Sequence, residues 1–213
     1  PQRPPPSLSG EPGTLAVEPF TAAQVRRVLH RFTPGTAAGP SGLSIQHLLD
    51  LCEVPGSPLP EALARVLHLI ASGEVPSAAR PYVFGARLVA LVKKDGGLRP
   101  IACGEAVRRM AAKLLCGRHT ADLGATLRQV GQVGVGVRGG GESLAHAARR
   151  VSALWRDDPA HFMLKVDLVN AFNMVERQTV LDACLARMPG LYPYACCAYA
   201  TPSTLFFADE EIP

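Results

Sequence analysis

Asp167 and a pair of basic residues have the types and spacing for metal and phosphate chemistry. Asp167 ends the apolar run HFMLKV, and a carboxylate at the carboxyl end of a strand is a common ligand for a divalent cation or a substrate group. Lys93 and Arg99 lie at the turn KDGG. The lysine ammonium would offer a triphosphate a compact charge, and the arginine guanidinium would offer it a planar set of hydrogen-bond donors. Each has an ordinary alternative, because aspartates make turns and caps and lysines keep a hairpin edge soluble.

The residues that follow Asp167 favour the functional interpretation. The sequence continues as Asn170-Ala171-Phe172-Asn173, a small residue followed by an aromatic one. A small residue lets a ligand approach the backbone amides, and an aromatic ring can form a flat wall against a sugar or a base. This order predicts a nucleotide-sized ligand beside the carboxylate.

A glycine-rich loop offers a second phosphate-binding motif. Residues 134–139 match GxGxxG and precede a predicted helix, as in dinucleotide-binding proteins. The preceding residues, LRQVGQV, make a poor buried strand, and the pattern before them is helical. Dinucleotide-binding proteins carry an acidic residue at the end of the next strand, and Asp167 lies at that place in the predicted order. An oxidoreductase therefore stays an alternative. The sequence has no GK[ST] phosphate loop and no GxSxG nucleophile motif.

Charge is concentrated in the middle of the 213 residues. The chain has 22 Lys and Arg against 18 Asp and Glu, but residues 80–156 hold 14 basic residues against four acidic ones, a net +10. Such a surface is typical of a protein with a phosphate-bearing partner. A composition that is 47% hydrophobic and 19% charged excludes disorder throughout. The longest apolar runs are too short for a membrane span.

The apolar periodicity predicts the elements that position these residues. Two apolar runs joined by Asp-Gly-Gly indicate a β-hairpin, and Pro100 restricts its second strand to an edge or an irregular part of the sheet. The run 161–168 predicts a buried strand that ends at Asp167. The other predicted elements are helices over 22–32, 44–52, 60–71, 105–116 or beyond, 143–155, 177–187 and 191–200, and a strand over 203–207.

Six cysteines include no CxxC pair, which predicts free thiols and no zinc site. With no leader sequence in view, we expect an intracellular setting. Residues 1–19 contain six prolines and predict a flexible linker. Both ends of the sequence read as cuts through a longer protein.

Three of these features, in this order, resemble the reverse transcriptase domain of non-LTR retrotransposons. The likeness extends over AAGPSGLSIQHLL (37–49), LVKKDGGLRPI (91–101), GQVGVGVRGGGESLAHA (131–147) and LKVDLVNAFNMVER (164–177). The most specific part is K…RPI followed by D-x-x-x-A-F-N after an apolar run.

The resemblance implies an RNA-directed DNA polymerase that copies an RNA template onto a DNA primer from dNTPs. It implies that Asp167 is the first catalytic aspartate and binds both ions of a two-Mg²⁺ site, with the Leu168 carbonyl as a further ligand. Phe172 would be the steric gate against a ribose 2′-OH, the amides of Asn170 and Ala171 would lie near the triphosphate, and Lys93 and Arg99 would clamp its phosphates. The basic helices would track the nucleic-acid backbone.

The sequence also departs from the family. Ser41 stands where the family usually has Asp, and the second metal-binding motif, aromatic-x-Asp-Asp, is absent. The late acids Asp209, Glu210 and Glu211 lack its hairpin pattern. The implied molecule is a fragment, inactive without the C-terminal half of the polymerase; a non-catalytic relic that binds nucleic acid is the alternative.

The expected fold is therefore α+β: helix-rich polymerase fingers with a β-hairpin, and the first part of a palm with an incomplete sheet. The expected regions are the linker at 1–19, the fingers at 20–160 and the start of the palm at 161–213.

Overall fold

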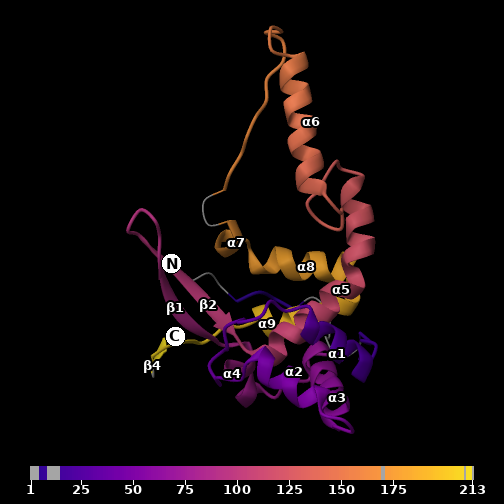
Figure 1. Ribbon diagram of the computed structural model, residues 1–213, viewed down its shortest axis with the longest axis vertical. Helices are drawn as coiled ribbons and strands as arrows, with labels where there is room; N and C mark the ends of the chain where they lie inside the picture. The colour runs from indigo at the N-terminus through magenta and orange to yellow at the C-terminus, as the bar shows by residue number, and fades with distance from the viewer. Residues whose placement is uncertain (1–4, 9–14, 169–170, 209, 213) are drawn as a thin grey trace. The chain divides into compact units, whose positions relative to one another are not determined.

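The computed structural model describes residues 5–8, 15–168, 171–208 and 210–212, and its fold is α+β, as predicted (Figure 1). The chain forms two compact units. The first unit comprises Pro1–Leu115 with Glu176–Pro213, and the second comprises Cys116–Val175. Among the described helices, none combines the length and the apolar character needed to cross a membrane. The expected linker, fingers and palm regions stay a prediction, because compactness does not test a functional division.

Three helices begin the first unit, close to where the sequence predicts them (Figure 1). Helix α1 (Ala22–His30) starts at Thr21, whose side chain accepts a hydrogen bond from the Gln24 amide at 3.3 Å. Helix α2 (Ile45–Glu53) starts at Ser44 in the same way. Helix α3 (Leu59–Ala71) has a proline in its first turn, where no amide hydrogen is needed. Their apolar faces form the main core with the first part of α5 (Ala106–Arg128).

A four-stranded mixed sheet has the order β2-β1-β3-β4. Strand β1 (Ala86–Val92) pairs antiparallel with β2 (Leu98–Gly104) and parallel with β3 (Leu205–Phe207), which pairs antiparallel with β4 (Glu210–Ile212). The predicted hairpin and the predicted strand near 203–207 are confirmed. Strand β2 is an edge strand, so Pro100 costs the sheet no inner hydrogen bond.

Shorter elements complete the first unit. A 3₁₀ turn, η2 (Ser77–Ala79), leads into α4 (Arg80–Phe84), which ends just before β1. Later in the chain, α8 (Arg177–Arg187), η3 (Pro189–Leu191) and α9 (Tyr192–Tyr199) surround a second, smaller apolar cluster centred on Leu181 and Tyr192. All six cysteines are free, as predicted.

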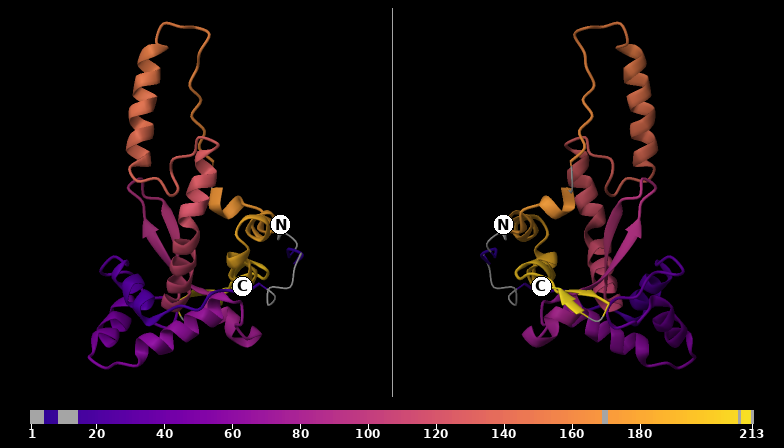
Figure 2. Two further views of the ribbon diagram at one scale, coloured as in Figure 1. Left: turned by 90° about the vertical axis from the view of Figure 1, so that its right-hand side faces the viewer. Right: turned by 90° about the vertical axis from the view of Figure 1, so that its left-hand side faces the viewer.

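The second unit contains the end of α5, the helix α6 (Gly140–Leu154) and the short helix α7 (Ala171–Met174). After α6 the chain turns and runs back in the opposite direction (Figure 2). The prediction of a buried strand at 161–168 is wrong. These residues form neither helix nor strand, and all eight are exposed. A strand is stable when a neighbour pairs with its backbone, and no described strand pairs with this segment.

Candidate functional site

The basic hairpin is a regular structure with a tight turn at its end. Its register pairs Val92 with Leu98 and Leu91 with Arg99. Beyond the last pair, the Lys93 amide donates to the Gly97 carbonyl at 2.7 Å, and the Asp95 carboxylate accepts from the Gly97 amide at 3.0 Å. Gly96 has a φ of 79°, which a residue with a Cβ rarely adopts. The Asp-Gly-Gly sequence therefore forms the turn that the pattern predicted.

The charges of this turn are free to bind an anion. Lys93, Lys94 and Arg99 are all exposed, and among the described residues none of the three forms an ion pair. Alternation along the strands puts Arg99 on the same face as Leu91 and Arg87. The turn end of the hairpin points away from the helices of its own unit (Figure 1). The structure thus presents Lys93 and Arg99 to solvent around one turn.

A shallow depression of about 310 Å³ lies at the other end of β2. It is lined by Ala37, the last residues of β2, Arg108 and Arg109. Arg108 donates to the Phe84 carbonyl and Arg109 to the Ala37 carbonyl, each at 2.8 Å. Both guanidinium groups are thereby fixed by neutral acceptors and keep their full positive charge. A Cβ at Gly104 would overlap the Arg108 guanidinium, so a larger residue at this position would displace that side chain.

Ser41 and Glu105 join the loop 37–42 to the start of α5. One carboxylate oxygen of Glu105 accepts from the Ser41 amide at 2.7 Å, and the other accepts from its hydroxyl at 2.8 Å. Glu105 is 8% exposed and is the one buried charged residue among those described. Gly39 passes so close that a Cβ there would lie 2.8 Å from the Glu105 backbone. The serine that departs from the family pattern is thus the donor to a buried carboxylate.

Two basic side chains of α5 lie over the ring of Phe32. The Lys113 ammonium lies 4.1 Å from the centre of the Phe32 ring, and the Arg109 guanidinium lies 5.5 Å from it. Lys113 also donates to the Arg31 carbonyl at 2.8 Å. Burial, and then the charges of Arg31 and Arg109, lower the pKa of Lys113. Two cations therefore lie over one aromatic ring, which attracts positive charge through its face.

The residues predicted around the first catalytic aspartate belong to the second unit. Asp167 and Leu168 lie in the exposed, irregular segment 161–168. Asn170 lies outside the described residues. Ala171 is half-buried and begins α7, whose backbone includes Phe172, but the Phe172 side chain, predicted as a steric gate, is outside the description. These roles stay predictions.

The predicted magnesium site also remains a prediction. The described residues include no group of three or more His, Cys, Asp and Glu side chains placed to hold a metal ion. Asp167 and the Leu168 carbonyl alone offer one carboxylate and one neutral oxygen, which do not make up a two-ion site.

The glycine-rich loop packs on the helix that precedes it. A Cβ at Gly136 would lie 2.9 Å from the Cα of Gly124 in α5, and a Cβ at Gly140 would overlap the Val133 carbonyl. Gly139, with a φ of 68°, leads into α6. The residues between α5 and α6 form turns and bends rather than the strand that a dinucleotide motif requires. Close packing explains these glycines without a bound phosphate.

Two parts of this site were missed by the sequence analysis. The Ser41–Glu105 contact joins residues 64 positions apart, and nothing in the local pattern signals it. The anchoring of Arg108 and Arg109 on carbonyl groups was missed for the same reason, although their place near the start of a predicted helix was evident.

No protein-family model matches the chain. No curated protein matches it either.

Proposed function

We propose that the chain is part of a reverse transcriptase of the non-LTR retrotransposon type, and that its first unit holds an incoming nucleotide and nucleic acid by their phosphates. The observation that carries the proposal is the exposed hairpin turn. It presents Lys93 and Arg99 without a carboxylate partner among the described residues, in the sequence K…RPI that resembles the family. A cation kept free at the end of a hairpin is available to a phosphate.

In this proposal the two parts of the chain have different tasks. Lys93 and Arg99 bind the triphosphate of a dNTP, and the cations around the depression contribute a positive field for the template–primer backbone. Asp167 and the Leu168 carbonyl bind magnesium, which supplies charge stabilisation in phosphoryl transfer. Phe172 excludes the ribose 2′-OH, beside the amides of Asn170 and Ala171. Synthesis requires further carboxylates, which a partner segment with an aromatic-x-Asp-Asp motif would provide.

The first test measures the affinity of the full chain for a dNTP. Replacing both Lys93 and Arg99 with Ala is expected to weaken dNTP binding by at least about tenfold, because it removes two charged donors to the triphosphate. Arg65→Ala is the matched control, because Arg65 is an exposed arginine of α3. An unchanged dNTP affinity in the double variant would contradict the proposal.

The second test asks about chemistry. The chain is combined with a polypeptide that carries the aromatic-x-Asp-Asp motif, and primer extension is measured with dNTPs. Asp167→Asn is expected to abolish extension and leave duplex binding unchanged. Phe172→Val is expected to admit ribonucleotides. Extension that survives Asp167→Asn would refute the catalytic role.

A non-catalytic nucleic-acid-binding relic is the second candidate. The observation that favours it is the exposure of the whole segment 161–168, since a working site holds its carboxylate in a fixed place. The relic predicts duplex binding without extension in the complemented system. The dinucleotide-binding oxidoreductase ranks lower, because its glycine motif follows a helix and turns rather than a strand.

A further inference from the structure

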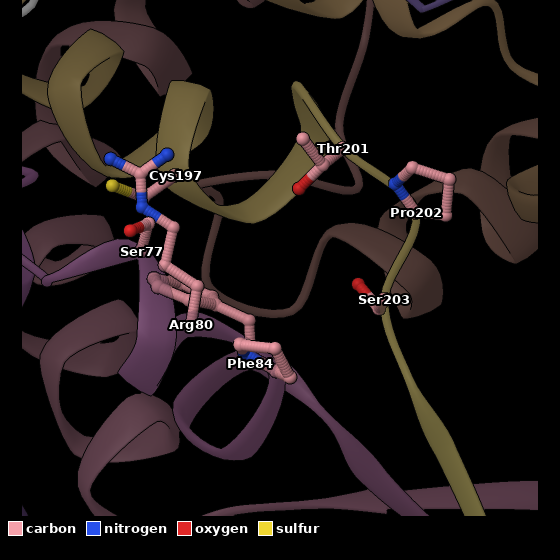
Figure 3. Close-up of a pocket in the computed structure, with 8 residues that line it drawn as sticks. Ser77, Arg80, Phe84, Cys197, Thr201, Pro202 and Ser203 are labelled. Atoms are coloured by element: carbon pink, nitrogen blue, oxygen red, sulfur yellow. The ribbon is translucent and has the colours of Figure 1, made fainter. Parts of the chain in front are cut away.

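A cavity on the first unit lies away from every residue predicted from the sequence. It has a volume of about 160 Å³ and lies between α4, with the turn before it, and the segment that connects α9 to β3. Figure 3 shows the Arg80 guanidinium and the Ser77 hydroxyl on one side of it, and the hydroxyls of Thr201 and Ser203 on the other. Phe84 and Pro202 contribute apolar walls. A cation and three hydroxyl groups thus surround one small space.

Arg80 is held in place but keeps donors free. Its Nε donates to the Val75 carbonyl at 3.1 Å, and its two terminal nitrogens have no hydrogen-bond partner among the described residues. That free edge of a guanidinium is the geometry that binds two oxygens of a phosphate or carboxylate. Because no Asp or Glu lines the cavity, the charge of Arg80 is not neutralised there.

The remaining wall of the cavity is neutral. The Cys197 thiol donates to the Gly73 carbonyl at 3.1 Å, and burial raises its pKa, an effect that the nearby charge of Arg80 partly offsets. The thiol therefore stays protonated near neutral pH and adds no negative charge. The cavity as a whole is positive and fits an anion.

An exposed aromatic pair lies next to this cavity. Tyr82, in the same short helix as Arg80, is 64% exposed and stacks on Phe206 of β3, with ring centres 6.3 Å apart and planes at 18°. Arg87 of β1 is the backbone partner of Phe206. An aromatic face beside cations is the arrangement that holds unpaired bases, since stacking is open to any base.

One carboxylate opposes an anionic ligand on this face. Glu211 of β4 pairs with Phe206 from the other side, and its carboxylate accepts from the Thr204 hydroxyl at 3.4 Å. It lies beside the aromatic pair and does not line the cavity. Its negative charge should weaken binding of a nucleic acid. Removing this charge should therefore strengthen binding, whereas removing a group that contacts the ligand should weaken it.

We propose that this face, formed by α4 and residues 201–207, binds single-stranded nucleic acid. A backbone phosphate occupies the cavity, held by the free edge of Arg80 and the hydroxyls of Ser77, Thr201 and Ser203. An unpaired base stacks on Tyr82. The site goes beyond the proposed function, because it includes neither the hairpin turn nor Asp167. It also binds an unpaired strand instead of a duplex.

The test measures the affinity of the full chain for a fluorescein-labelled oligonucleotide of twelve thymidines by anisotropy. Tyr82→Leu is expected to weaken binding about tenfold, and Thr201→Val by roughly threefold through loss of one hydroxyl donor. Glu211→Gln is expected to strengthen it by about twofold. Tyr199→Leu and Arg65→Ala are the controls, since both side chains are exposed and neither lines the cavity; both should bind within twofold of the unaltered chain.

Each result decides for or against the site. Unaltered affinity in both Tyr82→Leu and Thr201→Val, with folding verified by thermal unfolding, would overturn it. Inorganic phosphate or thymidine monophosphate that competes as well as the oligonucleotide would show a small-anion site and would also overturn the single-strand assignment. Each variant is tested with the RNA–DNA duplex as well. A dNTP affinity that depends on Lys93 and Arg99, while Tyr82→Leu and Thr201→Val both leave the oligonucleotide affinity unchanged, would refute this inference and not the proposed function.

Discussion

The two units of the chain differ in what stabilises them. In the first unit, Leu29, Leu67, Met110 and Tyr192 are at most 1% exposed, and two apolar clusters bury the inner faces of its helices. In the described part of the second unit, the buried residues are two glycines, Gly124 and Gly140.

This difference indicates where each unit obtains its stability. Burial of apolar side chains is the main favourable term in folding, and the first unit has it in its own residues. The second unit keeps large apolar side chains in solvent, among them Leu154 at 72% and Phe162 at 84% exposed. An apolar surface of this kind is typical of a region that binds something else. The proposed catalytic carboxylate therefore lies in the unit whose described residues form no apolar core.

The largest expected effect comes from one leucine in each unit. Leu67→Ala should lower the free energy of unfolding by about 3 kcal/mol, because it removes a fully buried side chain and leaves a cavity. Leu164→Ala, at a position 75% exposed, should change it by less than about 0.5 kcal/mol. Denaturation with urea measures both. Equal losses would show that residues 161–168 are buried in solution and would remove the contrast between the units.

A second charge at the Ser41–Glu105 contact should have the next largest effect. Ser41→Asp replaces the hydroxyl donor to a buried carboxylate with a like charge and leaves the backbone amide in place, at a cost of about 2 kcal/mol. Lower pH should reduce the loss, because protonation of one carboxyl restores a donor. Exchanging the two residue types, with Ser41→Asp and Glu105→Ser together, should recover most of the stability. A double variant no more stable than Ser41→Asp alone would show that the contact does not join the loop to α5.

Two glycine substitutions compare close packing in the two units. Gly39→Ala presses a Cβ against the Glu105 backbone and should destabilise the first unit by about 1–2 kcal/mol. Gly136→Ala meets α5 as closely, at a φ of 66°, but we expect it to loosen the glycine-rich loop without affecting the unfolding of the first unit. Hydrogen exchange resolved by segment distinguishes the outcomes. A global loss from Gly136→Ala would mean that the two units unfold together.

The smallest expected effect concerns Lys113. Its pKa is lowered in the folded chain, first by burial, so the unfolded chain binds more protons between the lowered pKa and the ordinary value of 10.5. The stability linked to Lys113 is fully present above 10.5 and is lost as the pH falls through the lowered value. Relative to Lys113→Gln, the unaltered chain should therefore gain stability as the pH rises from 7 towards 10.5. An identical pH dependence in the two proteins would contradict the lowered pKa of the half-buried Lys113.

Local patterns predicted the elements of the first unit well. The caps at Thr21 and Ser44, the periodic leucines of α3 and the Asp-Gly-Gly turn each act within a few residues, so the sequence shows both the signal and its effect. The same reasoning failed at 161–168. An apolar run indicates a buried strand, but pairing depends on a neighbour elsewhere in the chain or in another molecule.

For the candidate site, the sequence by itself determined the hairpin and the residue types at its turn, because turn chemistry and strand alternation are local. Tertiary structure alone decided which charges are free and which are anchored. Arg108 and Arg109 donate to carbonyls from distant segments, Glu105 meets a serine 64 positions away, and Arg80 meets Thr201 and Ser203 around one cavity. Contacts between distant residues arise from packing of the whole chain, and a linear pattern does not encode their partners.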